Sequence, residues 1–343
     1  MQVDQEITKK LILATLAYYD LFDFPLTLEE IEKFLIQPEV LNKGSTFESR
    51  SSRSNLEESV EISRLNLGIQ KEIEKLVREG LVIEDRGFYT LSKREQIIPV
   101  RIRKMQIAQK KLEHARRVAG WMSLVPYIRG VFASGSLALQ NTSEDSDLDF
   151  FVITKAGRIW TARFLVTGLL SFLGVRRKAN QQIAPDKVCL NHYISDDALE
   201  IKNQNIFTAR IYAHLVPLYL HKTFQHSQEC WNVLSKNHTL LSEFKHKNQW
   251  VLDYVMSWPT NDEYLVKNNL FLNFAKRLFE LIGNSPLGSL FEKFVRNYQK
   301  SRIECNPKTH EPNGRIDYTD QVLQFHPDSI EKSILDKYKS RTK

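Results

Sequence analysis

The segment Val131–Thr154 reads VFASGSLALQNTSEDSDLDFFVIT and carries the strongest folding signal of the chain. Its apolar start predicts a short strand that ends at Ser134, and the small residues after it predict a turn and a short helix. The apolar run Leu148–Thr154 predicts a second, longer strand. The acidic pattern Asp147-Leu148-Asp149 stands at the beginning of this second strand.

These residues suit chemistry on phosphate groups. Gly135 lets the backbone approach a phosphate closely, and free N–H groups at the start of the following helix attract an anion near Ser136. Residues two apart on a strand point to the same side, about 7 Å apart, so Asp147 and Asp149 can bind shared divalent cations. Two cations about 4 Å apart suit nucleotidyl transfer, because one activates the attacking oxygen and the other stabilises the departing pyrophosphate.

The pattern resembles the DNA polymerase beta-like nucleotidyltransferase superfamily over residues 115–222. The resemblance implies that Gly135 and Ser136 hold a nucleoside triphosphate, with ATP as the expected nucleotide. It also implies that Asp147 and Asp149 are catalytic residues that bind two Mg²⁺ ions. The expected activity is the Mg²⁺-dependent transfer of a nucleoside monophosphate to an acceptor hydroxyl, which the sequence does not identify.

The family pattern has one gap in this sequence. A third carboxylate normally lies on a later strand, which corresponds here to Lys187–His192. Cys189 or Asn191 occupies that position, and neither is an acid. Four acids near the ends of the strand are candidate substitutes, namely Asp186, Asp196, Asp197 and Glu200. Because the third acid helps to deprotonate the attacking hydroxyl in the family, the alternative function is a catalytically impaired nucleotide-sensing or regulatory protein.

Other polar residues near this segment have simpler interpretations. Lys155, Arg158 and Arg163 surround the start of the next predicted helix, where a solvated helix face is expected rather than a phosphate site. Asn205 and its polar neighbours precede a further helix and are expected to cap it. His192 has no partner at metal-ligand spacing and is expected to be structural.

Residues 1–95 are expected to form a small helical domain with a hairpin. A first helix is predicted over about residues 5–20 and a second over 28–36. The polar stretch 37–60 is expected to be a mobile insertion. A third helix and a two-stranded hairpin over 81–91 follow, so the unit resembles a winged helix-turn-helix domain.

A winged helix-turn-helix suggests a DNA-binding regulator as a further alternative. The third helix carries three basic and three acidic side chains (Lys71, Glu72, Glu74, Lys75, Arg78 and Glu79). Phosphate contacts supply most of the affinity of such domains for DNA. Nucleic acid is therefore a possible but not a favoured partner.

Residues 96–124 are expected to form a basic linker helix. Between Lys93 and Arg117 there are nine basic residues and two acids, so this segment accounts for the whole net charge of +7. The basic face of the predicted helix includes Arg101, Arg103, Lys104, Lys110 and Lys111. Any polyanion is expected near this face, and its simpler interpretation is a solvated helix surface.

The fold class predicted from these patterns is α+β, with several domains. They are a winged helix-like domain (1–95), the linker helix (96–124), a small mixed-sheet nucleotidyltransferase core (125–222) and a helical C-terminal region (223–343). Within the core a helix is expected over 158–173 and a third strand over Lys187–Ile194. The segment 321–332, QVLQFHPDSIEK, is expected to be a packed helix with its N-terminal turn.

Composition fits ordinary globular domains, because 42% of the 343 residues are hydrophobic and 26% are charged. The three cysteines are far apart and form no CxxC pair, which favours a reducing compartment. The first residues show no apolar signal region, and the apolar segment 164–175 has about half the length that a bilayer requires. A cytoplasmic protein without a membrane partner is expected, and no heptad pattern predicts its oligomeric state.

Overall fold

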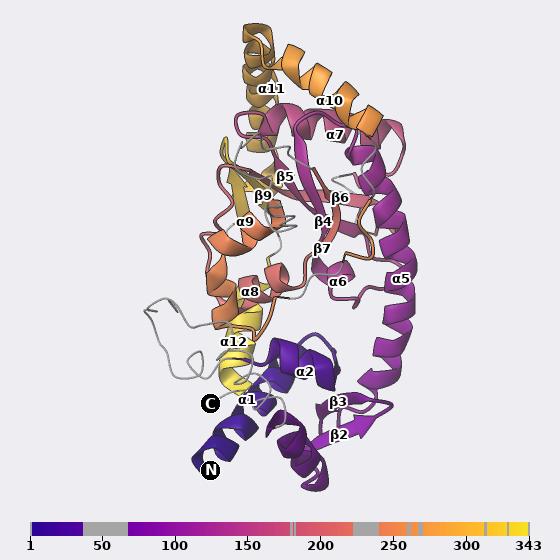
Figure 1. Ribbon diagram of the computed structural model, residues 1–343, viewed down its shortest axis with the longest axis vertical. Helices are drawn as coiled ribbons and strands as arrows, with labels where there is room; N and C mark the ends of the chain where they lie inside the picture. The colour runs from indigo at the N-terminus through magenta and orange to yellow at the C-terminus, as the bar shows by residue number, and fades with distance from the viewer. Residues whose placement is uncertain are drawn as a thin grey trace, which may run out of the picture.

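The computed structural model describes residues 2–36, 68–178, 181, 183–221, 240–258, 262–266, 270–311, 314–327 and 329–341. The chain is an elongated α+β structure in which helices α1 (Gln2–Asp20) and α2 (Leu28–Phe34) lie at one end (Figure 1). A mixed sheet occupies the middle, and helices α10 (Leu270–Gly283) and α11 (Pro286–Glu304) lie at the other end. The segment 37–60, predicted to be a mobile insertion, lies outside the described residues.

The N-terminal end contains the predicted helices and hairpin. A third helix, over residues 68–78, follows in the chain and packs in one core with α1 and α2. An antiparallel sheet follows the order β1 (Leu26–Thr27), β3 (Phe88–Leu91) and β2 (Val82–Asp85). Thr27 begins α2 with a reciprocal cap, because the Glu30 N–H donates to the Thr27 Oγ1 and the Thr27 N–H donates to the Glu30 carboxylate.

Helix α5 (Ile97–Met122) leads from this end to the central sheet, and it confirms the helix predicted over 96–124. The expectation of a solvated basic face is wrong at two of its positions. Arg101 is buried and donates to Glu30 Oε1 at 3.1 Å, and Lys111 is buried and donates to Asp186 Oδ1 at 2.9 Å. Buried cations need such partners. Here one partner comes from α2 and the other from the loop before the strand at 188–195.

The central sheet is mixed. Its strands follow the order β7 (Val216–Leu220), β4 (Ile128–Ala133), β5 (Leu148–Thr154), β6 (Val188–Ser195), β9 (Val322–His326) and β8 (Arg315–Tyr318). Strands β5 and β6 are parallel, and the other neighbouring pairs are antiparallel. The predicted strands at 148–154 and 187–194 are thus confirmed.

Helices cover both faces of this sheet. On one face, Phe150 and Val152 of β5 pack in a core with α5 and α7 (Ile159–Phe172). On the other face, Phe151 and Ile153 pack with α8 (Ile206–Ala213) and α9 (Leu240–Lys247). Alternate residues of a strand face opposite sides, so burial on both faces explains why β5 is a continuous apolar run. This burial fixes β5, and with it the position of Asp147 and Asp149 at its start.

The prediction of a helical region over 223–343 is wrong in part. Helices α9, α10, α11 and α12 (Glu331–Arg341) and the short helices η1 (Gln249–Asp253) and η2 (Pro307–His310) are present, but β8 and β9 lie among them. The segment QVLQFHPDSIEK contains strand β9 instead of the predicted helical turn, and α12 follows it. The alternation of apolar and polar residues over Leu323–His326 fits a strand, and pairing with the edge of β6 completes it.

Helix α7 contains most of the apolar segment 164–175. Its Val166 and Leu170 are buried, whereas Phe172 at its last turn is 89% exposed. Among the described residues, no helix combines the length and the apolar character needed to cross a bilayer.

Candidate functional site

The turn between β4 and β5 brings Gly135 against Asp149. The Ser134 N–H donates to the Asp149 carbonyl oxygen at 2.9 Å, so the turn is fastened to the start of β5. Gly135 has φ +60°, and a Cβ atom added there would lie 2.8 Å from Asp149 Oδ2. Both facts favour glycine at this position, because another residue would strain the backbone and displace the Asp149 carboxylate. The helix that follows, α6 (Gly135–Ala138), is a single turn that also carries Ser136.

Three side chains at the start of β5 and β6 form a cluster of potential metal ligands. One ligand atom from each of Asp147, Asp149 and Cys189 lies within 4.8 Å of the others. The parallel register pairs Asp149 with Cys189. The two acids that the sequence pattern singled out therefore share a site, next to the Gly135 turn.

Each acid also has a protein partner. Arg177 Nη1 donates to Asp147 Oδ2 at 2.6 Å, and Asn191 Nδ2 donates to Asp149 Oδ1 at 2.9 Å. Burial, together with the neighbouring charge of Asp147, raises the pKa of Asp149 to about 7. Sequence reasoning did not identify Arg177, which lies after α7 in a loop and carries no motif.

Lys111 of α5 holds the loop that precedes Asp147. Its Nζ donates to the carbonyl oxygens of Glu144 and Ser146 at 3.0 and 2.7 Å, and to the Asp186 carboxylate. Asp186, a candidate for the third acid, is therefore engaged by Lys111 and is not part of the metal-ligand cluster. Lys111 is therefore a positioning residue that holds the loop before β5 next to Asp186, which precedes β6.

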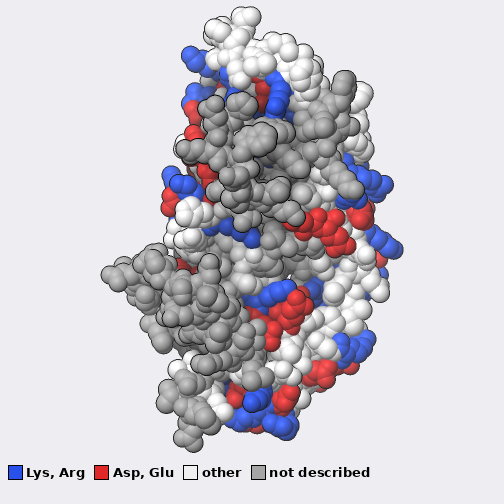
Figure 2. All heavy atoms as spheres, in the orientation of Figure 1, with Lys and Arg blue, Asp and Glu red and all other residues white. Residues whose placement is uncertain are grey.

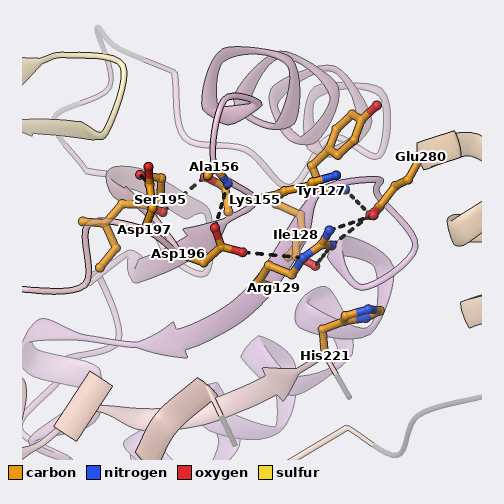
Figure 3. Close-up of polar contacts among 12 residues, drawn as sticks. Tyr127, Ile128, Arg129, Lys155, Ala156, Ser195, Asp196, Asp197, His221 and Glu280 are labelled. Atoms are coloured by element: carbon orange, nitrogen blue, oxygen red, sulfur yellow. Dashed lines mark hydrogen bonds and ion pairs between the residues drawn. The ribbon is translucent and has the colours of Figure 1, made fainter. Parts of the chain in front are cut away.

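The remaining candidates for the third acid lie elsewhere. Asp196 follows the far end of β6, about 20 Å along the strand from Cys189. There it accepts from the Ala156 N–H at 2.8 Å and lies 3.9 Å from Arg129 Nε (Figure 3). Asp197 beside it accepts a hydrogen bond from Ser195, and Glu200 is exposed further along the chain. The position beside Asp149 thus belongs to Cys189 and Asn191.

The expectation of solvated arginines at the start of α7 is wrong. Arg158 is buried and donates to the Gly288 carbonyl oxygen and to Ser289 Oγ, and Arg163 donates to Gln299 Oε1. Both side chains attach α7 to α11. The cap predicted near Asn205 is confirmed, because its side chain accepts from the Thr208 N–H at the start of α8.

The chemistry of the donor set fits one Mg²⁺ ion better than two. Two carboxylates supply the oxygen ligands that Mg²⁺ prefers, and water and phosphate oxygens normally complete its shell. The third group, the Cys189 thiol, is a soft ligand that suits other metals better. Burial also raises the pKa of Cys189, which disfavours the thiolate.

Comparisons with protein-family models, with curated proteins and with solved structures gave no match to this chain. The basis for assigning a function is therefore the geometry of the site and the chemistry of its residues.

Proposed function

We propose that the chain binds a nucleoside triphosphate with Mg²⁺ at Asp147 and Asp149 and transfers the nucleoside monophosphate to an acceptor hydroxyl. The observation that supports this is the contact between the Gly135 turn and Asp149, with Asp147 and Cys189 in the same cluster. A turn without side-chain bulk beside two carboxylates gives a triphosphate room to lie next to a cation. ATP is the expected nucleotide.

In this function each residue has a separate role. Asp147 and Asp149 would hold the cation, which neutralises phosphate charge in the transition state. The Gly135–Ser136 backbone would lie along the triphosphate. Arg177 presents a guanidinium beside Asp147, and the planar fork of N–H groups suits a phosphate oxygen pair. Lys111 would keep the Asp147 loop in place.

A second candidate is nucleotide sensing without transfer. Cys189 and Asn191 favour it, because they stand where the third carboxylate of the superfamily is expected and neither is a strong base at neutral pH. In that case the chain would bind the nucleotide, and Asn191 would orient Asp149 without activating an acceptor hydroxyl.

A DNA-binding function has weaker support. Arg101 and Lys111, two of the five cations on which a polyanion site was based, are buried in ion pairs. Two more basic side chains of α5 face acids, since Arg103 pairs with Glu144 and Arg116 with Glu113. The positive surface available to a nucleic-acid backbone is therefore smaller than the sequence predicts.

The proposed site is tested by replacing both acids, Asp147→Asn with Asp149→Asn, and measuring Mg²⁺-dependent binding of a fluorescent ATP analogue. Binding is expected to weaken by at least about 100-fold, because the cation loses its protein ligands. The matched control is Asp145→Asn, since Asp145 is exposed in the same turn. Equal binding by the double variant and the parent would refute the site.

Release of pyrophosphate from labelled ATP then separates the two candidates. Release by the parent and not by the double variant supports transfer. Nucleotide binding by the parent without release supports sensing, and the absence of binding to any nucleoside triphosphate would contradict both.

A further inference from the structure

Helix α10 packs on the sheet through its polar side. Lys276 is buried and its Nζ donates to the Ile128 carbonyl oxygen at 2.6 Å. One turn later, Glu280 accepts from Arg129 at 2.7 Å and from the Tyr127 N–H at 2.6 Å (Figure 3). Residues four apart share one face of a helix, so these contacts fix which face of α10 points inward.

The opposite face of α10 is apolar and exposed. It consists of Phe274, Leu278, Phe279, Leu281 and Ile282, whose exposed fractions run from 52% to 70%. A surface helix normally buries its apolar side and exposes its polar side. In α10 this arrangement is reversed, and the buried ion pair prevents the helix from turning over.

Helix α11 extends the same surface. Its buried side contains Val295 and Gln299, and its exposed large side chains are Leu287, Leu290, Phe291, Phe294 and Tyr298. A pocket of about 180 Å³ lies between the two helices and α7, and its lining includes Phe279, Phe291 and, from α7, Leu165. We call the ten exposed side chains of α10 and α11 the apolar hairpin surface. In Figure 2 the tip of the molecule at this end is white, and charged groups lie beside and below it.

The apolar hairpin surface is large enough for a stable interface. A fully exposed aromatic side chain offers about 150–250 Å². At the exposed fractions of Phe274, Phe279, Phe294 and Tyr298, the aromatic part alone is about 400–600 Å². The aliphatic side chains add a similar area, so the total reaches the roughly 800 Å² that each partner buries in a standard complex. The largest apolar patch of a typical monomer is about 300–600 Å².

We infer that the apolar hairpin surface binds a second copy of this chain, so that α10 and α11 of two protomers form a two-fold symmetric helical interface. Such an interface uses the same patch on both copies and needs no other partner. Four amphipathic helices brought together bury their apolar sides in a common core. The inference does not depend on the proposed activity, because Asp147 directly precedes β5, whereas Lys155 after the other end of β5 donates to Asn284, which follows α10.

The area of the surface favours a second copy, because two such faces together bury what a stable dimer needs. Cations border the surface: by helical spacing Lys293 lies about 60° around α11 from Leu290. At the end of the surface, Arg302 Nη1 donates to the Tyr298 hydroxyl at 3.1 Å. Both cations lie close enough to meet an anionic bilayer in contact with the apolar side chains, so vesicle binding is measured beside the oligomeric state.

The oligomeric state tests the inference. Sedimentation velocity of the full chain at micromolar concentration is expected to show a dimer. The variant Leu281→Glu with Phe294→Glu is expected to be a monomer, with a dissociation constant raised by at least about 100-fold, because both charges would be buried in the interface. Both positions are about 70% exposed in the single chain, so its thermal unfolding should change little. The matched control is Ile330→Glu, an exposed apolar residue near α12 at the other end.

Two results would overturn the inference. One is a parent protein that stays monomeric at high concentration, and the other is a double variant that dimerises as well as the parent. Co-sedimentation with vesicles of phosphatidylcholine and phosphatidylglycerol, at a ratio of three to one, is measured in parallel. A monomer that binds these vesicles through the same side chains would assign the surface to lipid instead.

Discussion

At the residue scale, Cys189 distinguishes the two proposed functions. Its side chain lies in the cluster with Asp147 and Asp149, where a third carboxylate would bind a cation or accept a proton. Replacement by aspartate, Cys189→Asp, is expected to raise Mg²⁺-dependent pyrophosphate release by about 100-fold or more, since a positioned general base contributes that much. Without Mg²⁺ the third charge repels the other two, so the variant is expected to unfold at lower denaturant concentration than the parent.

The matched control is Cys189→Ser, which has a similar volume and no charge. It is expected to leave both the rate and the unfolding midpoint close to those of the parent. If the serine and aspartate variants release pyrophosphate equally well, Cys189 does not stand in the place of the missing acid.

His214 couples the stability of the fold to pH. Its ring hydrogen-bonds to the Tyr19 hydroxyl at 2.8 Å, and burial with the charges of Arg210 and Arg101 lowers its pKa from 6.5 to about 3. The unfolded chain therefore binds a proton at His214 between pH 6.5 and 3, and the folded chain does not. The contribution of neutral His214 to the free energy of unfolding is complete above pH 6.5 and is lost as the pH falls through this range.

This effect is measured by urea unfolding at several pH values between 7 and 4, with His214→Gln compared to the parent. The variant should have a smaller slope of unfolding free energy against pH, by up to about 1.4 kcal/mol per pH unit. Identical slopes would mean that His214 titrates alike in both states. The matched control is His246→Gln, which replaces a histidine at an exposed position of α9.

At the scale of elements, Glu280 and Lys276 are two buried polar attachments of α10. Glu280 pairs with Arg129, which is buried, and removal of one member of a buried ion pair costs about 3–5 kcal/mol. Because Asp196 lies 3.9 Å from the same guanidinium, the variant Glu280→Gln is expected to cost about 3 kcal/mol, at the lower end of that range.

Urea unfolding measures this loss, and hydrogen exchange should show faster opening of α10 than of β5. An exposed cation on the adjacent helix α11 gives the control, since Lys293→Gln should change the free energy of unfolding by less than about 0.5 kcal/mol. An equally small loss for both variants would show that α10 is held by other contacts.

Elements with a strong local pattern were predictable from the sequence. The run from Leu148 to Thr154 and the helical spacing of α5 and α7 gave bounds within a few residues of those in the structure. Strands β8 and β9 were not predicted, although Arg315–Tyr318 and Leu323–His326 each alternate polar and apolar residues. An alternation of four residues is the shortest that indicates a strand, and pairing of β9 with β6 across the chain decides the outcome.

The same contrast between local patterns and long-range contacts holds for the candidate site. The sequence predicted that Asp147 and Asp149 lie close to the Gly135 turn, since strand periodicity and turn chemistry are local. Arg177 and Lys111 were not, because each meets the acid loop from a distant part of the chain. The burial of Arg101 was missed for a similar reason, since its partner Glu30 belongs to another unit.

At the scale of the whole molecule, the two ends of the chain are tied together. Asp20 at the end of α1 is buried and accepts from Arg94 and from Arg341 of α12, both at 2.6 Å. Helix α12 also packs on α8, and Tyr338 meets Tyr18 with ring centroids 5.3 Å apart. The N-terminal unit is therefore held to the central sheet by the last helix as well as by α5.

The pairing of β6 with β9 has a consequence for synthesis on the ribosome. Strand β6 leaves the ribosome about 130 residues before its partner, which at roughly 5–20 residues per second is a delay of about 7–26 s. During that time β6 offers an open edge of unpaired N–H and C=O groups to any other nascent strand. The growing chain is therefore most exposed to misassembly late in translation, and a chaperone that shields this edge would act before residue 326 emerges.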